Sequence, residues 1–308
     1  MRLSISLTNY SWRDGPLVDV LARTAQMADQ GGLDTLWVPD HLAQVDPTVP
    51  DDAEDMLEAY GVLTYLAGRT ERVRLGTLVT NVALRPPALL ANAVATLDTL
   101  SGGRAWLGMG AGYDTTETSD LGLPTLPLGL RFGLLEETVK VVTQMMAGDE
   151  ERFAGRHVQL GRPFLRPLPA RRVPMLIGGT GERRTLRLVA EHADACNLFD
   201  LPDGGATVRR KLAVLTRHCE SVGRPREEIE ATLSTRLAAN ETIAELVGRC
   251  ERVAGWGIEH LIFVSSTPWA AVDLDVLIGA AAIVAELRPP RTPDPRDADE
   301  NAVDPTGG

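Results

Sequence analysis

The sequence is poor in several residue types, and each shortage argues against a class of protein. Its 308 residues include three scattered cysteines without a C-x-x-C motif, Cys196, Cys219 and Cys250. An odd, unpaired set of this kind argues against a disulfide framework and against a zinc site. Five histidines lie far apart without an H-x-H or H-E-x-x-H pattern, so the ligand set of a metal-dependent barrel hydrolase is missing.

Long apolar runs and clustered positive charge are also missing. No run reaches the length of a membrane span, and the first residues lack the hydrophobic stretch of a signal peptide. The net charge of −11 leaves no basic stripe to neutralise phosphates, which argues against nucleic acid as a partner. We therefore expect a cytoplasmic protein that binds neither nucleic acid nor membrane.

The stretch 74–112 is the most informative part of the chain. Residues 75–80 are apolar and β-branched, which is typical of a strand buried on both faces. Pro86 and Pro87 open a helix, and Ser101-Gly102-Gly103 ends it. A second buried strand follows at 105–109. Strand, helix and strand within about forty residues predict a βαβ unit with a parallel sheet.

The same alternation continues along the chain and predicts an α/β fold, a (β/α)8 TIM barrel, as a single domain over 1–288. Strands are expected at 3–7, 35–38, 75–80, 105–109, 175–177, 195–199, 231–237 and 260–264. Helices are expected at 16–30, 54–68, 86–100, 131–146, 182–192, 207–222, 241–255 and 272–287. The pattern breaks at 148–173, which we interpret as an irregular or hairpin insertion. The polar, proline-rich tail 289–308 is expected to be disordered.

Candidate site residues follow the strands, because active groups of this fold lie at the carboxyl ends of the strands. Asp40 and His41 come directly after the second strand, although a lone histidine at such a place is more often a polar surface residue. Gly178-Gly179-Thr180-Gly181 precedes a helix. Its unpaired N–H groups and the helix dipole would favour an anion, and the alternative is a glycine-rich turn without a ligand.

Five short sequence segments occur in an order and with a spacing that indicate a family resemblance. They are R-L-G-T-L-V-T, R-P-P-A-L-L-A, T-L-D-T-L-S-G-G-R, L-G-M-G-A-G and I-G-G-T-G-E-R-R-T-L-R-L-V-A-E-H-A-D-A-C-N. Together with Asp40-His41 they span most of the first two hundred residues. On these phrases the sequence resembles the luciferase-like monooxygenase superfamily, and within it the oxidoreductases that use the deazaflavin coenzyme F420.

The resemblance implies roles for several residues. Asp40 and His41 would contact the deazaflavin ring and take part in catalysis by stabilising or exchanging a proton. A non-proline cis peptide at Thr77–Leu78, or one bond later, would back the ring. Further contacts to the cofactor would come from that strand end and from the glycine series after the fourth strand, through Thr77, Leu78, Val79, Thr80, Gly110 and Tyr113.

The resemblance also makes Gly178, Gly179, Thr180 and Gly181 the cradle for the phosphodiester of F420 or for the phosphate of FMN. Tyr113 departs from the pattern, because the sugar-phosphate dehydrogenases of the family have a carboxylate there and use it as a general acid. Glu117 lies one turn further on and is not favoured as its replacement. Tyr113 and Trp12, which follows the first strand, are candidates for the substrate pocket.

The sequence thus predicts an F420-dependent oxidoreductase that transfers a hydride between deazaflavin C5 and a small organic substrate. The βα loops and the insertion 148–173 would hold this substrate above the ring. A monooxygenase using reduced FMN and oxygen on the same barrel is the main alternative, and a non-catalytic flavin- or deazaflavin-binding relative is a third. The resemblance further implies a homodimer.

Overall fold

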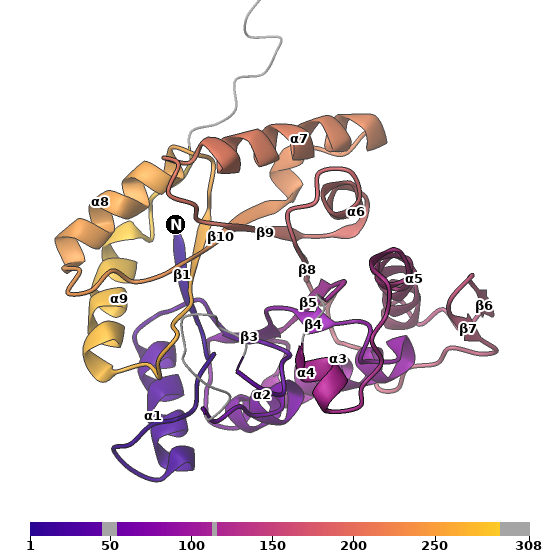
Figure 1. Ribbon diagram of the computed structural model, residues 1–308, viewed down its shortest axis with the longest axis horizontal. Coiled ribbons are helices and arrows are strands. Elements are labelled where there is room, and N and C mark those ends of the chain that lie inside the picture. The colour runs from indigo at the N-terminus through magenta and orange to yellow at the C-terminus, as the bar shows by residue number, and fades with distance from the viewer. Residues whose placement is uncertain (45–53, 113–115, 290–308) are drawn as a thin grey trace, which may run out of the picture.

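The computed structural model describes residues 1–44, 54–112 and 116–289. Eight parallel strands form a closed barrel with helices around it (Figure 1). The barrel closes because the first strand pairs with both the second and the last, and the third pairs with the fifth. The barrel strands are β1 (Arg2–Ser6), β2 (Thr35–Val38), β3 (Arg74–Thr77), β5 (Ala105–Gly110), β8 (Met175–Gly178), β9 (Ala195–Phe199), β10 (Glu230–Thr235) and β11 (His260–Phe263). The predicted fold class is confirmed.

The helices run along the outside of the barrel (Figure 1). They are α1 (Leu17–Gln30), α2 (Ala59–Ala67), α3 (Pro87–Ser101), α4 (Thr116–Asp120), α5 (Leu128–Met146), α6 (Thr185–His192), α7 (Ala206–Val222), α8 (Ile243–Ala254) and α9 (Ala271–Val284), with a short 3-10 helix at Arg226–Glu228. In the described part of the chain, no helix has both the length and the apolar character needed to cross a membrane.

Side chains alternate between two hydrophobic clusters along the strands. On β2, Leu36 and Val38 belong to the large core between strands and helices. Trp37, between them, belongs to a second cluster with Trp106, Leu176, Ala195 and Ile262. Successive side chains of a strand point to opposite faces, so the second cluster fills the barrel interior. Leu78 and Val79 pack against it.

Three helices begin three or more residues away from the expected start. Glu58 caps α2 by accepting the N–H groups of Tyr60 and Gly61, so this helix starts at Ala59 and not at 54. The segment expected to be loop before 131 contains α4 and the first turn of α5. The chain after β8 makes a longer turn than expected, and α6 begins at Thr185 and not at 182.

The insertion 148–173 contains the expected hairpin, with β6 (Phe153–Ala154) antiparallel to β7 (Gln159–Leu160). Its expected position over the substrate is wrong. The hairpin lies on the outer side of α5 (Figure 1), where Glu137 accepts the N–H groups of His157 and Val158. The insertion joins the end of a helix to the next strand, so it leaves the barrel at the end opposite to the βα loops. The expected tail, 289–308, lies outside the described residues except for 289.

Candidate functional site

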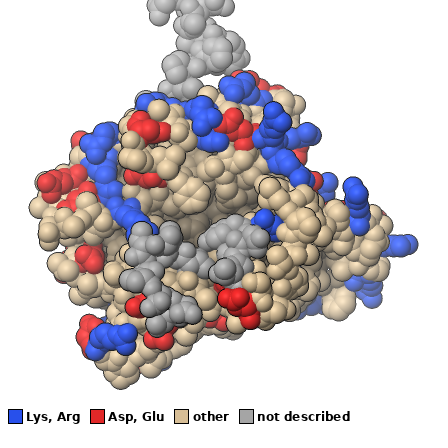
Figure 2. Space-filling view, in the orientation of Figure 1, with Lys and Arg blue, Asp and Glu red and all other residues tan. Residues whose placement is uncertain are grey.

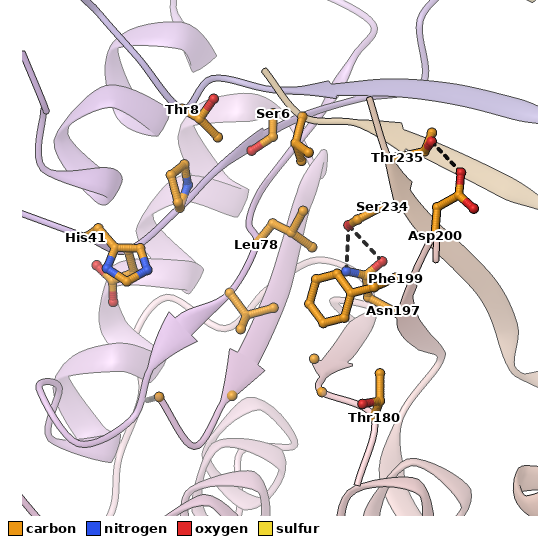
Figure 3. Close-up of a pocket in the computed structure, with 18 of the residues that line it drawn as sticks. Ser6, Thr8, His41, Leu78, Thr180, Asn197, Phe199, Asp200, Ser234 and Thr235 are labelled. Carbon is orange, nitrogen blue, oxygen red and sulfur yellow. Dashed lines mark hydrogen bonds between the residues drawn. The ribbon is translucent and has the colours of Figure 1, made fainter. Parts of the chain in front are cut away.

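A cavity of about 950 Å³ lies at the carboxyl end of the barrel, and a hollow is visible at this face in Figure 2. All eight barrel strands contribute lining residues, either from their last positions or from the loop that follows. Figure 3 shows His41 on one side, Leu78 at the centre, and Thr180, Asn197 and Ser234 on the other side. This is the end of the barrel at which active sites of the fold are built.

Asp40 lines the cavity but is nearly buried, and its carboxylate is held by the neighbouring loop. Arg85 donates to it twice, from Nε at 2.8 Å and from Nη2 at 2.5 Å, and the Asn81 N–H donates at 3.2 Å. Arg85 also pairs with Glu58 at 2.6 Å. Burial would lower the pKa of Arg85, but the two carboxylates outweigh it and raise this pKa above its usual value. Asp40 therefore joins the loops after β2 and after β3.

His41 is oriented by Glu117, which the sequence pattern did not favour as a functional residue. Its Nδ1 lies 2.9 Å from Oε2 of Glu117 on α4. The other carboxylate oxygen accepts the N–H groups of Leu42 and of Ala43. Burial would raise the pKa of Glu117, but these hydrogen bonds and the nearby imidazole lower it overall. An ionised carboxylate only accepts, so Nδ1 carries the proton in this pair.

The chain between β3 and the short strand β4 (Thr80–Asn81) crosses the floor of the cavity. Its Leu78–Val79 peptide is cis, which is the second of the two bonds named in the sequence analysis. Leu78 and Val79 line the cavity. Thr77 and Thr80 are fully buried, share a 2.8 Å hydrogen bond, and lie outside the described lining.

The predicted glycine positions make room for Val79. A Cβ added at Gly110 would lie 2.6 Å from Val79 Cγ2, and one at Gly178 would lie 2.9 Å from Val79 Cγ1. At Gly108 it would lie 1.8 Å from the Thr77 carbonyl oxygen. These glycines therefore let β5 and β8 approach the chain that follows β3, and Gly110 and Gly178 also line the cavity.

The loop after β8 brings Gly178, Gly179, Thr180 and Gly181 to the cavity wall. Gly179 has φ +111°, a conformation that side-chain-bearing residues rarely adopt. A Cβ at Gly181 would lie 2.9 Å from Thr185 Oγ1, so the loop packs closely against the start of α6. The Lys211 ammonium donates to the Thr180 carbonyl at 2.8 Å. Backbone N–H groups at the cavity wall, with a cation behind the loop, suit an anion.

A polar wall that the sequence analysis missed lies on β9 and β10. Asn197 donates to Ser234 Oγ at 2.8 Å, and Thr235 donates to Asp200 at 2.8 Å (Figure 3). Arg249 lies behind Thr235, at 3.0 Å from its hydroxyl. All of these residues line the cavity. Position at the end of a predicted strand, which selected Asp40 and His41, was the signal that could have found the residues of β9 and β10 and Asp200, but not Arg249, which lies on α8.

The two candidates for the substrate pocket gain no support. Tyr113 lies outside the described residues. Trp12 stacks edge-on against Tyr10, and its indole N–H donates to the Trp269 carbonyl at 3.0 Å. It is not among the described residues that line the cavity. Within the described ranges, no three histidine, cysteine or acidic side chains converge in a way that could hold a metal ion.

A comparison with protein families decides the relationship. The model of the luciferase-like monooxygenases matches residues 3–292. The chain belongs to the luciferase-like monooxygenase family. The uncharacterized protein Rv0953c of Mycobacterium tuberculosis is 30% identical over 186 residues, which cover 56% of this chain and 65% of that protein. The F420-dependent glucose-6-phosphate dehydrogenase of Kineococcus radiotolerans is 30% identical over 229 residues, 73% of this chain and 65% of that protein.

These two alignments span slightly less than two thirds of either relative, at 65% in each case. Two solved structures share the fold over nearly the whole chain. An F420-dependent secondary alcohol dehydrogenase in complex with an F420–acetone adduct has a TM-score of 0.76 at 19% identity, and covers 91% of this chain and 98% of its own. The monooxygenase RslO1 from Streptomyces bottropensis has a TM-score of 0.73 at 19% identity, with 93% and 98% covered. At such identities the likeness concerns the fold.

Proposed function

We propose that the protein is an F420-dependent oxidoreductase that exchanges a hydride with a small organic substrate. One observation carries the proposal: Asp40-His41, the Leu78–Val79 peptide and the glycine loop after β8 all line the same cavity. These segments are far apart in sequence, and the family resemblance implies a cofactor contact for each of them. Relatives named for F420 dependence support the choice of cofactor.

The residues present fit a deazaflavin. A cavity of about 950 Å³ is at the upper end of the range for small-molecule sites. Leu78 and Val79 supply an apolar floor for a flat ring system, and the 178–181 loop supplies N–H groups for a phosphodiester. When bound, the cofactor would supply a two-electron hydride carrier that reacts poorly with oxygen.

The chain's own groups would then bind and manage protons. We assign the proton-exchanging role to His41, because it lines the cavity and Glu117 fixes its Nδ1 proton. Asp40, which pairs with Arg85, would hold the loop that carries His41. Glucose-6-phosphate is not proposed as the substrate, because Tyr113 stands where the resemblance expects a carboxylate acid.

The alternative is a monooxygenase that uses reduced FMN. Its support is the shared fold with RslO1 and a glycine loop that suits either phosphate. A homodimer, which the resemblance implies, is also part of the proposal, and light scattering after gel filtration would measure it.

Equilibrium binding of F420 and of FMN to the purified protein, followed by ligand fluorescence, tests the proposal. We expect micromolar or tighter binding of F420, with FMN much weaker. The opposite preference would favour the monooxygenase and make oxygen consumption with reduced flavin the next assay. If neither ligand binds, the assignment of the glycine loop as an anion site is wrong.

A further inference from the structure

Two polar side chains of the cavity keep hydrogen-bonding capacity that the described protein does not use. Ser6 Oγ, on β1, is buried, lines the cavity and has no hydrogen-bond partner in the described ranges. Asp200, directly after β9, is half-buried and also lines the cavity. Its carboxylate accepts one hydrogen bond from the described chain, which Thr235 donates. Polar groups inside a folded protein rarely stay without partners, so both side chains indicate a polar ligand.

The charge of Asp200 indicates the sign of that ligand. The other described carboxylate that lines the cavity is Asp40, which Arg85 neutralises through two hydrogen bonds. Asp200 forms no ion pair with a described residue, and it carries a negative charge at neutral pH. A cavity wall with such a charge attracts a cation and repels an anion.

The two arginines near Asp200 do not pair with it. Arg249 is held by Glu241 instead, with distances of 2.9 Å from Nε to Oε1 and 2.6 Å from Nη2 to Oε2. Its Nη1 donates to the Thr235 hydroxyl at 3.0 Å, and this hydroxyl donates to Asp200 Oδ2 at 2.8 Å. Arg236 lines the cavity but forms no ion pair with Asp200. Oδ1 of Asp200 is therefore an acceptor for a ligand.

An exposed aromatic ring precedes this carboxylate in the sequence. Phe199, the last residue of β9, lines the cavity and is 54% exposed, so its ring is available to a ligand. Leu201, after Asp200, lines the cavity as well and is 46% exposed. Figure 3 shows Phe199 and Asp200 on the side of the cavity opposite His41. This wall combines an apolar surface with one negative charge, and an aromatic face can also bind a cation.

We propose that Phe199, Asp200 and Leu201 recognise an apolar substrate with a cationic nitrogen, a protonated amine or imine; this rests on the function proposed above. The two apolar side chains would contact the body of the substrate, and Asp200 would accept an N–H group of the nitrogen. A hydrogen bond from a cation to a carboxylate is stronger than one from a neutral hydroxyl. The same charge would disfavour substrates that carry a phosphate or a carboxylate.

Three small probes with the same aromatic ring test the charge preference. Benzylamine is a cation at neutral pH, benzyl alcohol is neutral and benzoate is an anion. Ligand-observed NMR measures their dissociation constants with the intact protein, first alone and then saturated with F420. At low ionic strength we expect benzylamine to bind about tenfold more tightly than benzyl alcohol, with benzoate weaker than both. Added salt should reduce the preference, because it screens the charges.

Two variants separate the charge of the wall from its apolar surface. Asp200→Asn keeps an acceptor for the Thr235 hydroxyl and should reduce the preference for benzylamine over benzyl alcohol to about twofold or less. Phe199→Ala should weaken all three probes by a similar factor and keep the preference. Asp275→Asn, at an exposed position of α9, makes the same change in net charge and should leave the three constants unchanged. Circular dichroism checks that the variants fold.

The outcomes separate this inference from the function on which it rests. If F420 does not bind, the proposed function fails, and the assignment of an amine as substrate fails with it. If F420 binds but benzylamine binds no more tightly than benzyl alcohol or benzoate, the inference is overturned while the function stands. The same holds if Asp200→Asn keeps the preference. Displacement of benzylamine by F420 would place the amine in the site of the cofactor and would also overturn the inference.

Discussion

At the scale of single residues, the position and the tautomer of His41 depend on Glu117. One carboxylate oxygen faces Nδ1, and the other holds two backbone N–H groups of the loop that carries the imidazole. A single side chain thus fixes the tautomer and the position of the ring. Glu117 is a positioning residue, and His41 is the group that reaches the cavity.

We predict that His41→Asn lowers turnover by roughly 10²- to 10⁴-fold, the usual contribution of a positioned acid–base group. Binding of F420 should change by no more than about threefold. The rate is followed by absorbance of the coenzyme, with whichever ketone, imine or enone in a panel supports turnover. Unchanged turnover would favour a protein that binds the cofactor without catalysis.

Glu117→Gln should keep the acceptor for the Leu42 and Ala43 N–H groups but remove the negative charge beside Nδ1. We expect kcat to fall by about tenfold or more while KM and F420 affinity stay nearly unchanged. Asp120→Asn, at an exposed position of the same helix, is the matched control. A loss of F420 binding or of folding in Glu117→Gln would show a role in the structure of the loop alone.

At the scale of elements, the cavity floor requires close approach of three strands. Gly108, Gly110 and Gly178 lie where a Cβ would strike the end of β3 or the chain that follows it. This close packing is the first reason why glycines occupy the positions that suggested a ligand site. The same absence of side chains leaves backbone exposed in the cavity.

We predict that Gly108→Ala destabilises the fold by about 3 kcal/mol, because the new methyl group would overlap the Thr77 carbonyl. Gly248→Ala is the control. Gly248 lies inside α8 with nothing within 4 Å of its would-be Cβ, so alanine should stabilise by about 0.5–1 kcal/mol. Urea denaturation measures both, and equal effects would contradict the packing argument.

At the scale of the whole molecule, a buried polar network joins the first strand of the barrel to the last two strands. Ser4 on β1 bonds Nε2 of His260 on β11, and His260 Nδ1 lies 2.8 Å from Glu230 on β10. The order Ser–His–Glu resembles a hydrolase triad, but Ser4 is fully buried and accepts the Thr35 N–H. Arg2 pairs with Glu230 as well. The network is therefore structural and stabilises the seam of the barrel.

This network makes stability fall in acid. Burial would raise the pKa of Glu230, but His260 and Arg2 lower it below its ordinary value of 4.5. The folded state holds the Glu230 carboxylate ionised. Its contribution to the free energy of unfolding is therefore fully present above about pH 4.5 and is lost as pH falls through the lowered pKa. Asp34, which pairs with Arg74, acts in the same direction.

We predict that Glu230→Gln costs about 3 kcal/mol at neutral pH, as for a broken buried ion pair, and that the difference from the parent narrows as pH falls below about 4. Urea denaturation at neutral pH and at a pH below about 4 gives the free energies of unfolding of the variant and of the parent. The exposed Glu220→Gln should change stability by less than about 0.5 kcal/mol. A pH-independent difference would contradict the linkage.

The sequence predicted the barrel and its order of elements because buried parallel strands and amphipathic helices have distinct periods. It also placed Gly178–181 and His41 at the right end of the strands. Helix starts were less predictable, since that of α2 depends on the side chain of Glu58. The partnership of His41 with Glu117 joins residues 76 positions apart, and only the closed fold brings them together.

Barrel closure has a consequence for synthesis. β1 is made first, yet its pairing partner β11 lies 256 residues later, as the Ser4–His260 contact shows. At the usual pace of translation the first strand waits roughly 10 to 50 seconds for this partner. During that time one side of β1 is an unpaired edge, which is a site for association with other chains. The nascent protein is thus most vulnerable to aggregation before its last strand leaves the ribosome.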